Sequence, residues 1–161
     1  MDRSGHPKLK ETSPPVRDVL LPKIKQVPSD TKCLKTGESL RGRWEIQGLI
    51  GRGGYGEIYF ATDKENGDRV AIKAECKDRR GKVAKRTILE QKVLLRLQGR
   101  PHAPKMLASG SEGHFNFIIM QVLSVNVTDL RKSSPSSTLT TSTVSRICIQ
   151  ALASLRDLHA I

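Results

Sequence analysis

The sequence predicts an α+β fold, in which a five-stranded antiparallel sheet with one helix is followed by one or two further helices. Three observations predict this fold. Short segments rich in β-favouring residues follow one another through tight connections, as in an antiparallel sheet. One stretch between these segments has apolar residues at helical spacing. A second stretch of the same kind lies at the end of the sequence.

The expected strands alternate with turn residues. A glycine-rich segment separates the first two strands, and Asn66-Gly67 marks a turn before the third. The last two strands are joined through Gly110-Ser111-Glu112-Gly113, which also favours a tight connection. The five strands are expected at 43–47, 57–62, 69–74, 105–109 and 115–121.

Two helices are expected. The first covers Ala84–Leu97, where Glu90 shares one face with the apolar residues at +3, +4 and +7. Glu90 is either a boundary residue turned to solvent or an inward acid that pairs with a cation. The second begins near Ser142, a good N-cap. Its apolar stripe includes Ile147, Leu152, Leu155 and Leu158, and an uncovered stripe of this kind predicts poor solubility or association.

Composition suggests one domain with an N-terminal extension. The chain has 161 residues, 28 Lys and Arg against 16 Asp and Glu, and a net charge of +12. Residues 1–40 are basic and proline-containing, and their apolar residues follow no sustained period. Such a stretch buries too little surface to offset the entropy of ordering it, so we expect a flexible extension before a domain at 41–161.

Several classes of protein are excluded. No apolar run approaches the ~20 residues that a membrane span requires, and the N-terminus lacks a secretory signal. Cys33, Cys76 and Cys148 are scattered and form no CxxC pair, which argues against a disulfide framework or a zinc site. We therefore expect a reducing compartment, the cytoplasm or the nucleus, and no metal site. The histidines, which also lack ligand spacing, are His6, His102, His114 and His159.

The pattern Gly51-x-Gly53-x-x-Gly56 indicates a loop that approaches phosphate groups, because glycine tolerates close backbone contact. A Walker loop would end in Gly-Lys-Ser/Thr, whereas Glu57 follows here. A dinucleotide-binding fold would continue as a helix, but the segment 57–60 favours a strand. A strand, a glycine loop and a second strand are the arrangement that covers nucleotide phosphates in protein kinases.

A second motif supports this interpretation. Val70-Ala71-Ile72-Lys73 matches the kinase strand whose lysine holds the α and β phosphates of ATP. A lysine among apolar neighbours needs an acidic partner, and Glu90 is the expected one. A lone strand lysine is usually a solvated charge, so the argument depends on the loop, the tetrapeptide and the helix acid occurring in this order.

Residues 43–161 resemble the N-terminal lobe and the first large-lobe helix of the casein kinase I superfamily, and are most similar to the tau-tubulin kinase branch. The resemblance implies a protein-kinase-like N-lobe at 41–122, and a hinge with the start of an incomplete C-lobe at 123–161. It also implies phosphoryl transfer from ATP to serine or threonine of protein substrates in the complete family member. The segments that resemble the branch are Gly53–Tyr59, Leu95–Gly99, Phe115–Gln121 and Asp129–Arg131.

The resemblance also assigns roles in an ATP site. Met120 corresponds to the gatekeeper, Gln121–Leu123 to the hinge, and Asp129 to a residue that reaches the ribose. From residue type alone, Met120 also fits a core position and Asp129 a solvated one. The interval between Lys73 and Glu90 is a few residues longer than usual in this family. The expected cofactor-binding residues are Ile50, Gly51, Arg52, Gly53, Gly54, Tyr55, Gly56, Glu57, Ile58, Ala71, Lys73, Glu90, Met120, Gln121, Leu123 and Asp129.

The catalytic motifs of kinases do not occur in this sequence. There is no His-Arg-Asp loop with a later Asn, and no Asp-Phe-Gly. His159 is not followed by Arg-Asp, so it is not the histidine of that loop. We therefore predict a truncated kinase that binds ATP weakly, is inactive alone and has no catalytic or metal-binding residues. Mg²⁺ is expected only in a complete kinase domain.

Two other functions stay open. A non-catalytic lobe that acts as a scaffold would lack the same motifs. A nucleic-acid-binding protein is suggested by the net charge and by the segment Lys77–Arg86, which has six basic residues in ten. Against the latter, no aromatic residues are interleaved for base stacking and no nucleic-acid module is present. We do not expect nucleic acid or a membrane as a partner.

Overall fold

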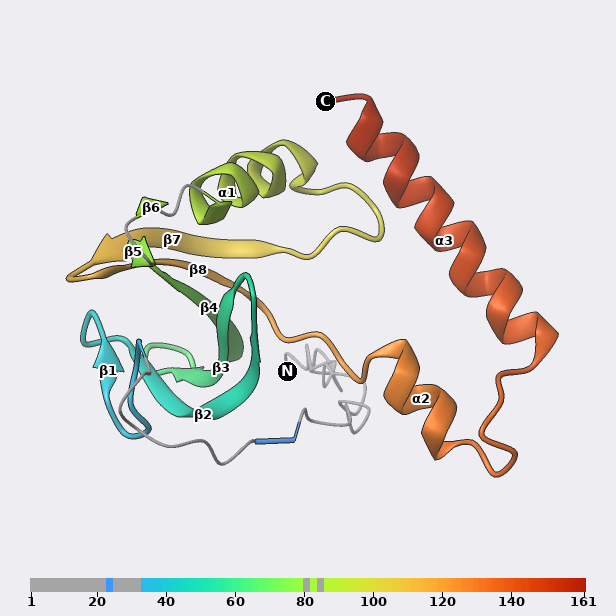
Figure 1. Ribbon diagram of the computed structural model, residues 1–161, viewed down its shortest axis with the longest axis horizontal. Coiled ribbons are helices and arrows are strands. Elements are labelled where there is room, and N and C mark those ends of the chain that lie inside the picture. The colour runs from blue at the N-terminus through green and yellow to red at the C-terminus, as the bar shows by residue number, and fades with distance from the viewer. Residues whose placement is uncertain (1–22, 25–32, 80–81, 84–85) are drawn as a thin grey trace, which may run out of the picture.

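The computed structural model describes residues 23–24, 33–79, 82–83 and 86–161. Its centre is a curled antiparallel sheet in the order β1-β2-β3-β4-β8-β7 (Figure 1). The α+β class is confirmed, but the sheet has six strands rather than five because β1 pairs with β2 at one edge. The strands are β1 (Ser39–Leu40), β2 (Trp44–Gly53), β3 (Gly56–Asp63), β4 (Arg69–Cys76), β7 (Met106–Glu112) and β8 (Phe115–Gln121).

Three helices and one small hairpin complete the described fold. The hairpin, β5 (Asp78–Arg79) with β6 (Lys82–Val83), lies between β4 and the first helix. The expected start of the last helix at Ser142 is wrong by two residues. Thr140 is the N-cap, because its backbone is extended and its hydroxyl accepts from the N–H of Thr143 at 3.2 Å. The helices are α1 (Arg86–Leu97), α2 (Val127–Ser133) and α3 (Thr141–His159).

The alternation of side chains along the strands divides the sheet into two faces. The core face lies inside the curl and carries large buried side chains, with Tyr59, Ile72, Phe117 and Ile119 each no more than 1% exposed. The opposite face, here called the Lys73 face, is covered in part by α1. Its members in register across β3, β4 and β8 are Ile58, Phe60, Ala71, Lys73, Ile118 and Met120.

The segment before β1 belongs to the packed structure. Cys33 and Leu34 are buried, and Leu40 is only 1% exposed. The compact part of the chain therefore begins before the expected boundary at residue 41. The segment shows no periodic pattern because it is irregular backbone that fills one end of the curl. Residues 1–22 and 25–32 lie outside the described residues, so a flexible extension there stays a prediction.

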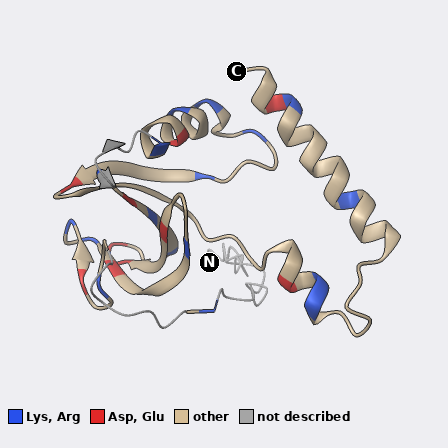
Figure 2. Cartoon of the chain, viewed as in Figure 1, with Lys and Arg blue, Asp and Glu red and all other residues tan. Residues whose placement is uncertain are grey.

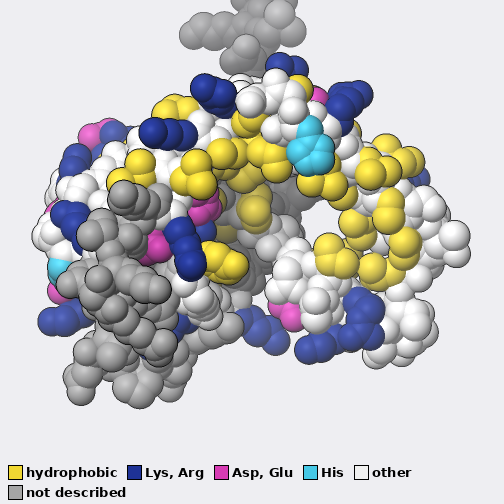
Figure 3. Space-filling view, turned by 45° about the horizontal axis from the view of Figure 1, so that its top comes forward, with side chains coloured by type: hydrophobic (Ala, Val, Ile, Leu, Met, Phe, Trp, Pro, Cys, Tyr) yellow, Lys and Arg dark blue, Asp and Glu magenta, His cyan; other side chains and the backbone are white. Residues whose placement is uncertain are grey.

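The C-terminal helices differ from the sheet. Neither α2 nor α3 contains a buried residue. Ile149 and Leu152 of α3 are 67% and 66% exposed. Figure 3 shows hydrophobic side chains beside an open space between the body that contains the sheet and α3. The expected stripe on α3 is thus largely uncovered in this chain. None of the helices in the described part of the chain is both long enough and apolar enough to cross a bilayer.

Candidate functional site

A glycine-rich hairpin joins β2 to β3. Gly53 pairs with Gly56, and Gly54 and Tyr55 form the turn between them. At Gly56 φ is +114°, and a Cβ would lie 2.4 Å from the carbonyl oxygen of Ala74. Glycine is therefore required at this position. A Cβ on Gly53 or Gly54 would meet nothing within 4 Å, so a ligand can approach the backbone N–H groups of the turn.

The structure brings Lys73 and Glu90 together. The Nζ atom of Lys73 donates to Oε2 of Glu90 at 2.5 Å. The two side chains are 17% and 34% exposed, so the ion pair is partly shielded from water and stronger than a surface pair. Glu90 is therefore an inward acid rather than one turned to solvent. An ammonium group carries three N–H donors, so the bond to Glu90 leaves capacity for an anionic ligand.

A buried carboxylate on β4 positions the start of α1. Glu75 is 7% exposed, and its Oε2 atom accepts from the backbone N–H of Thr87 at 2.8 Å and from its hydroxyl at 2.7 Å. An acid at a helix N-terminus satisfies a free N–H group and interacts favourably with the helix dipole. Because Glu75 and Lys73 are two residues apart on β4, they share the Lys73 face. The contact with Thr87 thus places Glu90, one turn later, opposite Lys73.

The long interval between Lys73 and Glu90 has a structural explanation. The β5–β6 hairpin occupies the connection between β4 and α1. A hairpin returns the chain close to its starting point, so the extra residues do not displace α1 from the sheet. The departure from the usual spacing therefore does not prevent the ion pair.

Apolar side chains lie in register with Lys73. Ile58 pairs with Lys73, and Ala71 pairs with Met120 across β4 and β8. Ala71 is buried, whereas Ile58 is 37% exposed and Met120 is half-buried. Ile50 lies at a register shift between β2 and β3 and is also half-buried. These residues can form one wall of a slot for a flat apolar group. A Cβ on Gly51 would lie 3.7 Å from Ile58, at the glycine-rich end of this wall.

The segment after β8 has its own contacts. The N–H of Gln121 donates to the carbonyl of Lys105 at 2.9 Å, and its side-chain oxygen accepts from the N–H of Lys105 at 3.1 Å. Leu123 is 55% exposed, in the segment between β8 and α2. Asp129 accepts from the side chain of Asn126 at 2.8 Å, and its N–H donates back to Asn126 at 2.8 Å. These bonds cap α2, so they explain Asp129 without any ligand.

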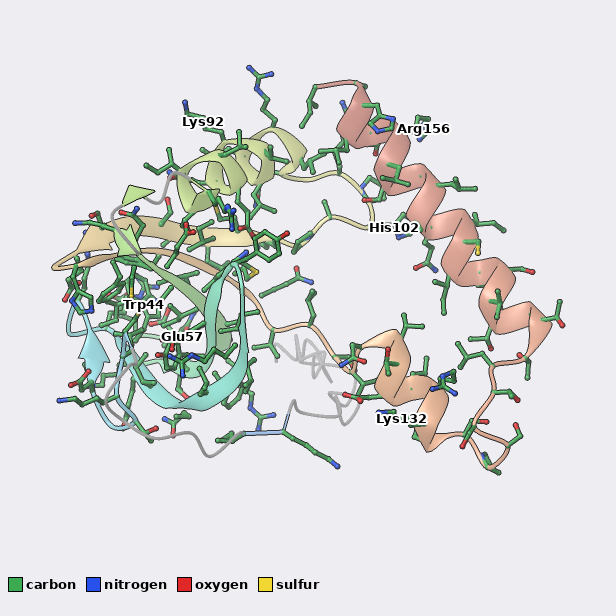
Figure 4. The ribbon with its side chains drawn as sticks, in the orientation of Figure 1. Trp44, Glu57, Lys92, His102, Lys132 and Arg156 are labelled. Carbon is green, nitrogen blue, oxygen red and sulfur yellow. The ribbon has the colours of Figure 1, made fainter. Side chains whose placement is uncertain are left out.

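Two of the expected cofactor residues lie elsewhere. Glu57 is buried on the core face, where Oε2 accepts from the hydroxyl of Tyr59 at 2.6 Å and from the N–H of Cys33 at 2.8 Å. Its other oxygen lies 3.1 Å from Nε of Arg52. Figure 4 shows Glu57 inside the curl of the sheet, below the strands that face α1. The side chains of Arg52 and Glu57 are therefore not grouped with Lys73, because strand alternation turns them to the opposite face.

Sequence reasoning missed three contacts that shape the site. Glu75 and Thr87 hold the start of α1, as described above. The guanidinium of Arg86 lies 5.1 Å from the centre of the Tyr55 ring and donates to the carbonyl of Gly54 at 3.4 Å, which joins α1 to the glycine-rich turn. Tyr55 itself is 67% exposed. A signal was available for Glu75 alone, since an acid two residues after Lys73 must lie on the same face of the strand.

Comparison with known proteins adds to this geometry. Residues 44–161 match the protein kinase domain model. The chain belongs to the protein kinase domain family. This kinase-type chain is 49% identical over 123 residues to a Caenorhabditis elegans protein named as a casein kinase I. It is 28% identical over 123 residues to a Dictyostelium discoideum protein named as a serine/threonine-protein kinase. The first match supports a similarity to the casein kinase I type within this family.

The kinase-type chain spans only part of these relatives. Each alignment covers 76% of this chain, but 36% of the Caenorhabditis protein and 24% of the Dictyostelium protein. Protein kinase domains in general use ATP with Mg²⁺. The residues of the Lys73 face fit a triphosphate and an adenine ring. The motifs that hold Mg²⁺ in kinases, a His-Arg-Asp loop with a later Asn and Asp-Phe-Gly, do not occur in these 161 residues.

Proposed function

We propose that this chain is the ATP-binding portion of a serine/threonine protein kinase of the tau-tubulin kinase branch. The observation that carries the proposal is the ion pair between Lys73 and Glu90 beside a glycine-rich turn. Branch membership rests on the segments 95–99, 115–121 and 129–131 of the sequence. In the complete protein we propose phosphoryl transfer from ATP to serine or threonine of protein substrates.

Different residues near the Lys73 face contact different parts of ATP in this proposal. Lys73 donates to the α and β phosphates, while its hydrogen bond with Glu90 holds the ammonium group in position. Backbone N–H groups around Gly53 and Gly54 cover the phosphates. Ala71 and its apolar neighbours contact the adenine ring, and the backbone at Leu123 bonds its edge.

We propose that the 161-residue chain does not itself transfer phosphate. No residue in it corresponds to the base that accepts the substrate proton or to the acids that hold Mg²⁺. Nucleotide affinity should be weak, because the described residues provide only one wall for the adenine ring. A reducing cytoplasm or nucleus remains our proposal for its location.

Nucleotide-dependent stabilisation tests the binding proposal. The melting temperature of the chain is measured with increasing ATP, up to about 10 mM, for the wild type, Lys73→Ala and Lys92→Ala. Lys92 is the matched control because it is an exposed lysine on the outer side of α1 (Figure 4). A bound ligand raises stability in proportion to the logarithm of its concentration over Kd. We expect a shift in the wild type and in Lys92→Ala, and at least tenfold weaker binding in Lys73→Ala.

The outcomes separate the alternatives. An absent shift in the wild type, or an equal shift in Lys73→Ala, would contradict nucleotide binding at this site. A circular dichroism spectrum equal to that of the wild type shows that the Lys73→Ala variant is folded. Phosphate transfer from radiolabelled ATP that Lys73→Ala abolishes would refute inactivity while leaving ATP binding intact. Salt-sensitive binding to DNA that persists in Lys73→Ala would favour the nucleic-acid function; residues 80–81 and 84–85 of the basic segment lie outside the described residues.

A further inference from the structure

Two cysteines and a histidine that are distant in sequence meet at one end of the sheet. The Sγ atoms of Cys33 and Cys76 are 2.9 Å apart. Together with a ring nitrogen of His114, all three possible ligand atoms lie within 4.8 Å of one another. Among the described residues, this is the one group of three cysteine, histidine or acidic side chains with such a spacing. The exposed Cys148, on α3, is not part of it.

Separate backbone contacts hold the three residues in place. The N–H of Cys33 donates to Glu57 at 2.8 Å, which anchors the segment before β1 on the core face. Cys76 ends β4 and pairs with Phe115 in β8. The carbonyl of His114, in the turn between β7 and β8, accepts from the N–H of Lys77 at 2.7 Å. These contacts bring the side chains together without requiring a bond between the sulfur atoms.

From this geometry we propose that Cys33, Cys76 and His114 bind a zinc ion. Zinc in proteins takes thiolate and imidazole ligands at about 2.3 and 2.0 Å, in tetrahedral geometry. Two thiolates on one such ion lie roughly 3.7 Å apart, so the sulfurs need to separate by less than about 1 Å. The position of His114 favours a metal site over a disulfide, because a disulfide joins only the two sulfurs and does not involve an imidazole.

The burial of the three residues fits this assignment. Cys33 is buried, Cys76 is half-buried and His114 is exposed. An ion can therefore enter from the side of His114, where solvent can supply the fourth ligand. Burial and the neighbouring Cys76 raise the pKa of the Cys33 thiol. A divalent cation bound by the two sulfurs would displace the thiol protons, because zinc binds the thiolate form of cysteine.

A zinc ion here would cross-link three segments of the fold. It would join the segment before β1 to the end of β4 and to the β7–β8 turn. The site lies on the core side of β4, away from Lys73 and Glu90, because Cys76 alternates with Glu75 along the strand. The proposal is therefore independent of nucleotide binding. It departs from the expectation of no metal site, which rested on the wide separation of the cysteines in sequence.

Zinc binding can be measured directly on the full chain. Reduced protein is stripped with a chelator, and zinc is titrated against a colorimetric competitor, with Cys33→Ser, Cys76→Ser, His114→Gln and Cys148→Ser as variants. We expect one zinc per chain in the wild type and in Cys148→Ser. Each of the other three variants should bind zinc at least roughly tenfold more weakly than the wild type. Cobalt(II) in place of zinc should give thiolate-to-metal charge-transfer absorption that Cys33→Ser and Cys76→Ser reduce.

Three results would overturn the proposal. The first is that the reduced wild type fails to bind zinc. The second is that His114→Gln binds zinc as tightly as the wild type. The third is a mass loss of two hydrogens in glutathione buffer at cytosolic poise, with the peptides of Cys33 and Cys76 linked. In that reaction the glutathione disulfide takes the two electrons and two protons from the thiols, and the pair is a disulfide rather than a metal site. Because His114 is exposed, His114→Gln should fold normally and keeps the test valid if a serine variant does not.

Discussion

The region that contains the sheet, residues 33–121, and the helical segment after it, residues 122–161, bury their apolar side chains to very different extents. The sheet encloses a core whose central residues are no more than 1% exposed. The helices have well-formed caps at Asn126 and Thr140, yet no residue of α2 or α3 is buried. Figure 2 shows long uncharged stretches along α3, whose only charged residues are Arg146, Arg156 and Asp157. Local helix signals and tertiary burial are thus separate properties.

This difference indicates which part of the chain carries its stability. Burial of apolar surface is the main favourable contribution to folding, and an exposed helix gains little beyond its own backbone bonds. The sheet should therefore fold as a unit, while α3 contributes little to the free energy of unfolding. Three pairs of matched substitutions examine this conclusion.

The largest difference is expected for isoleucine in the two regions. Ile119→Ala in β8 removes a side chain that is 0% exposed, and should lower the free energy of unfolding by about 2–5 kcal/mol. Ile149→Ala in α3, at 67% exposure, should change it by less than about 0.5 kcal/mol. Urea unfolding followed by tryptophan fluorescence measures both, since the single Trp44 lies in β2. Equal losses would show that α3 is packed in solution.

A smaller difference is expected for tyrosine within the sheet region. Tyr59 donates to Glu57 at 2.6 Å and accepts from the N–H of Leu34 at 3.1 Å, all in the core. Tyr59→Phe leaves these buried groups short of partners, at a cost of about 1–3 kcal/mol. Tyr55→Phe, at the exposed glycine-rich turn, is the control and should be close to neutral. A neutral Tyr59→Phe in denaturant unfolding would mean that water replaces the lost hydroxyl.

The smallest effect concerns acid. Hydrogen bonds from Arg43 lower the pKa of Asp63, which lies in the sheet. The folded state therefore resists protonation of Asp63 more than the unfolded state does. The resulting stabilisation is complete above the unfolded-state pKa of about 3.9 and is lost as pH falls below it. Asp63→Asn should flatten the dependence of unfolding free energy on pH below about 4, and Asp157→Asn in α3, a helix without buried residues, is the matched control. Identical pH profiles for the wild type and Asp63→Asn would show that Asp63 does not contribute to the loss of stability in acid.

The parts of the structure that sequence reasoning predicted are those with local signals. The strands around Gly51–Gly56 and Val70–Lys73 follow from β-favouring residues and turn glycines. Glu90 was placed by helical periodicity on the face with Leu94 and Leu97, both of which are buried. The starting points of helices were less accurate, because neighbouring hydroxyl residues such as Thr140 and Ser142 can all serve as caps.

The remaining features depend on residues that are distant in sequence. β1 has only two residues, so its propensity is too weak to detect, and it exists because β2 offers a free edge. The sequence pattern placed Glu57 in the phosphate loop, but the alternation of side chains along β3 directs it into the core. The contacts of Glu75 with Thr87 also required the spatial position of α1.

The sequence by itself determined the sheet class, the glycine-rich turn and the identity of the lysine and the acid that meet at the site. These depend on periodicity and on residue type, which act over a few neighbouring positions. Only the tertiary structure decided that Cys33 reaches Cys76 and His114, and that the helix face of α3 stays uncovered. Such contacts arise from the curl and register of the whole sheet, which join segments that no local pattern connects.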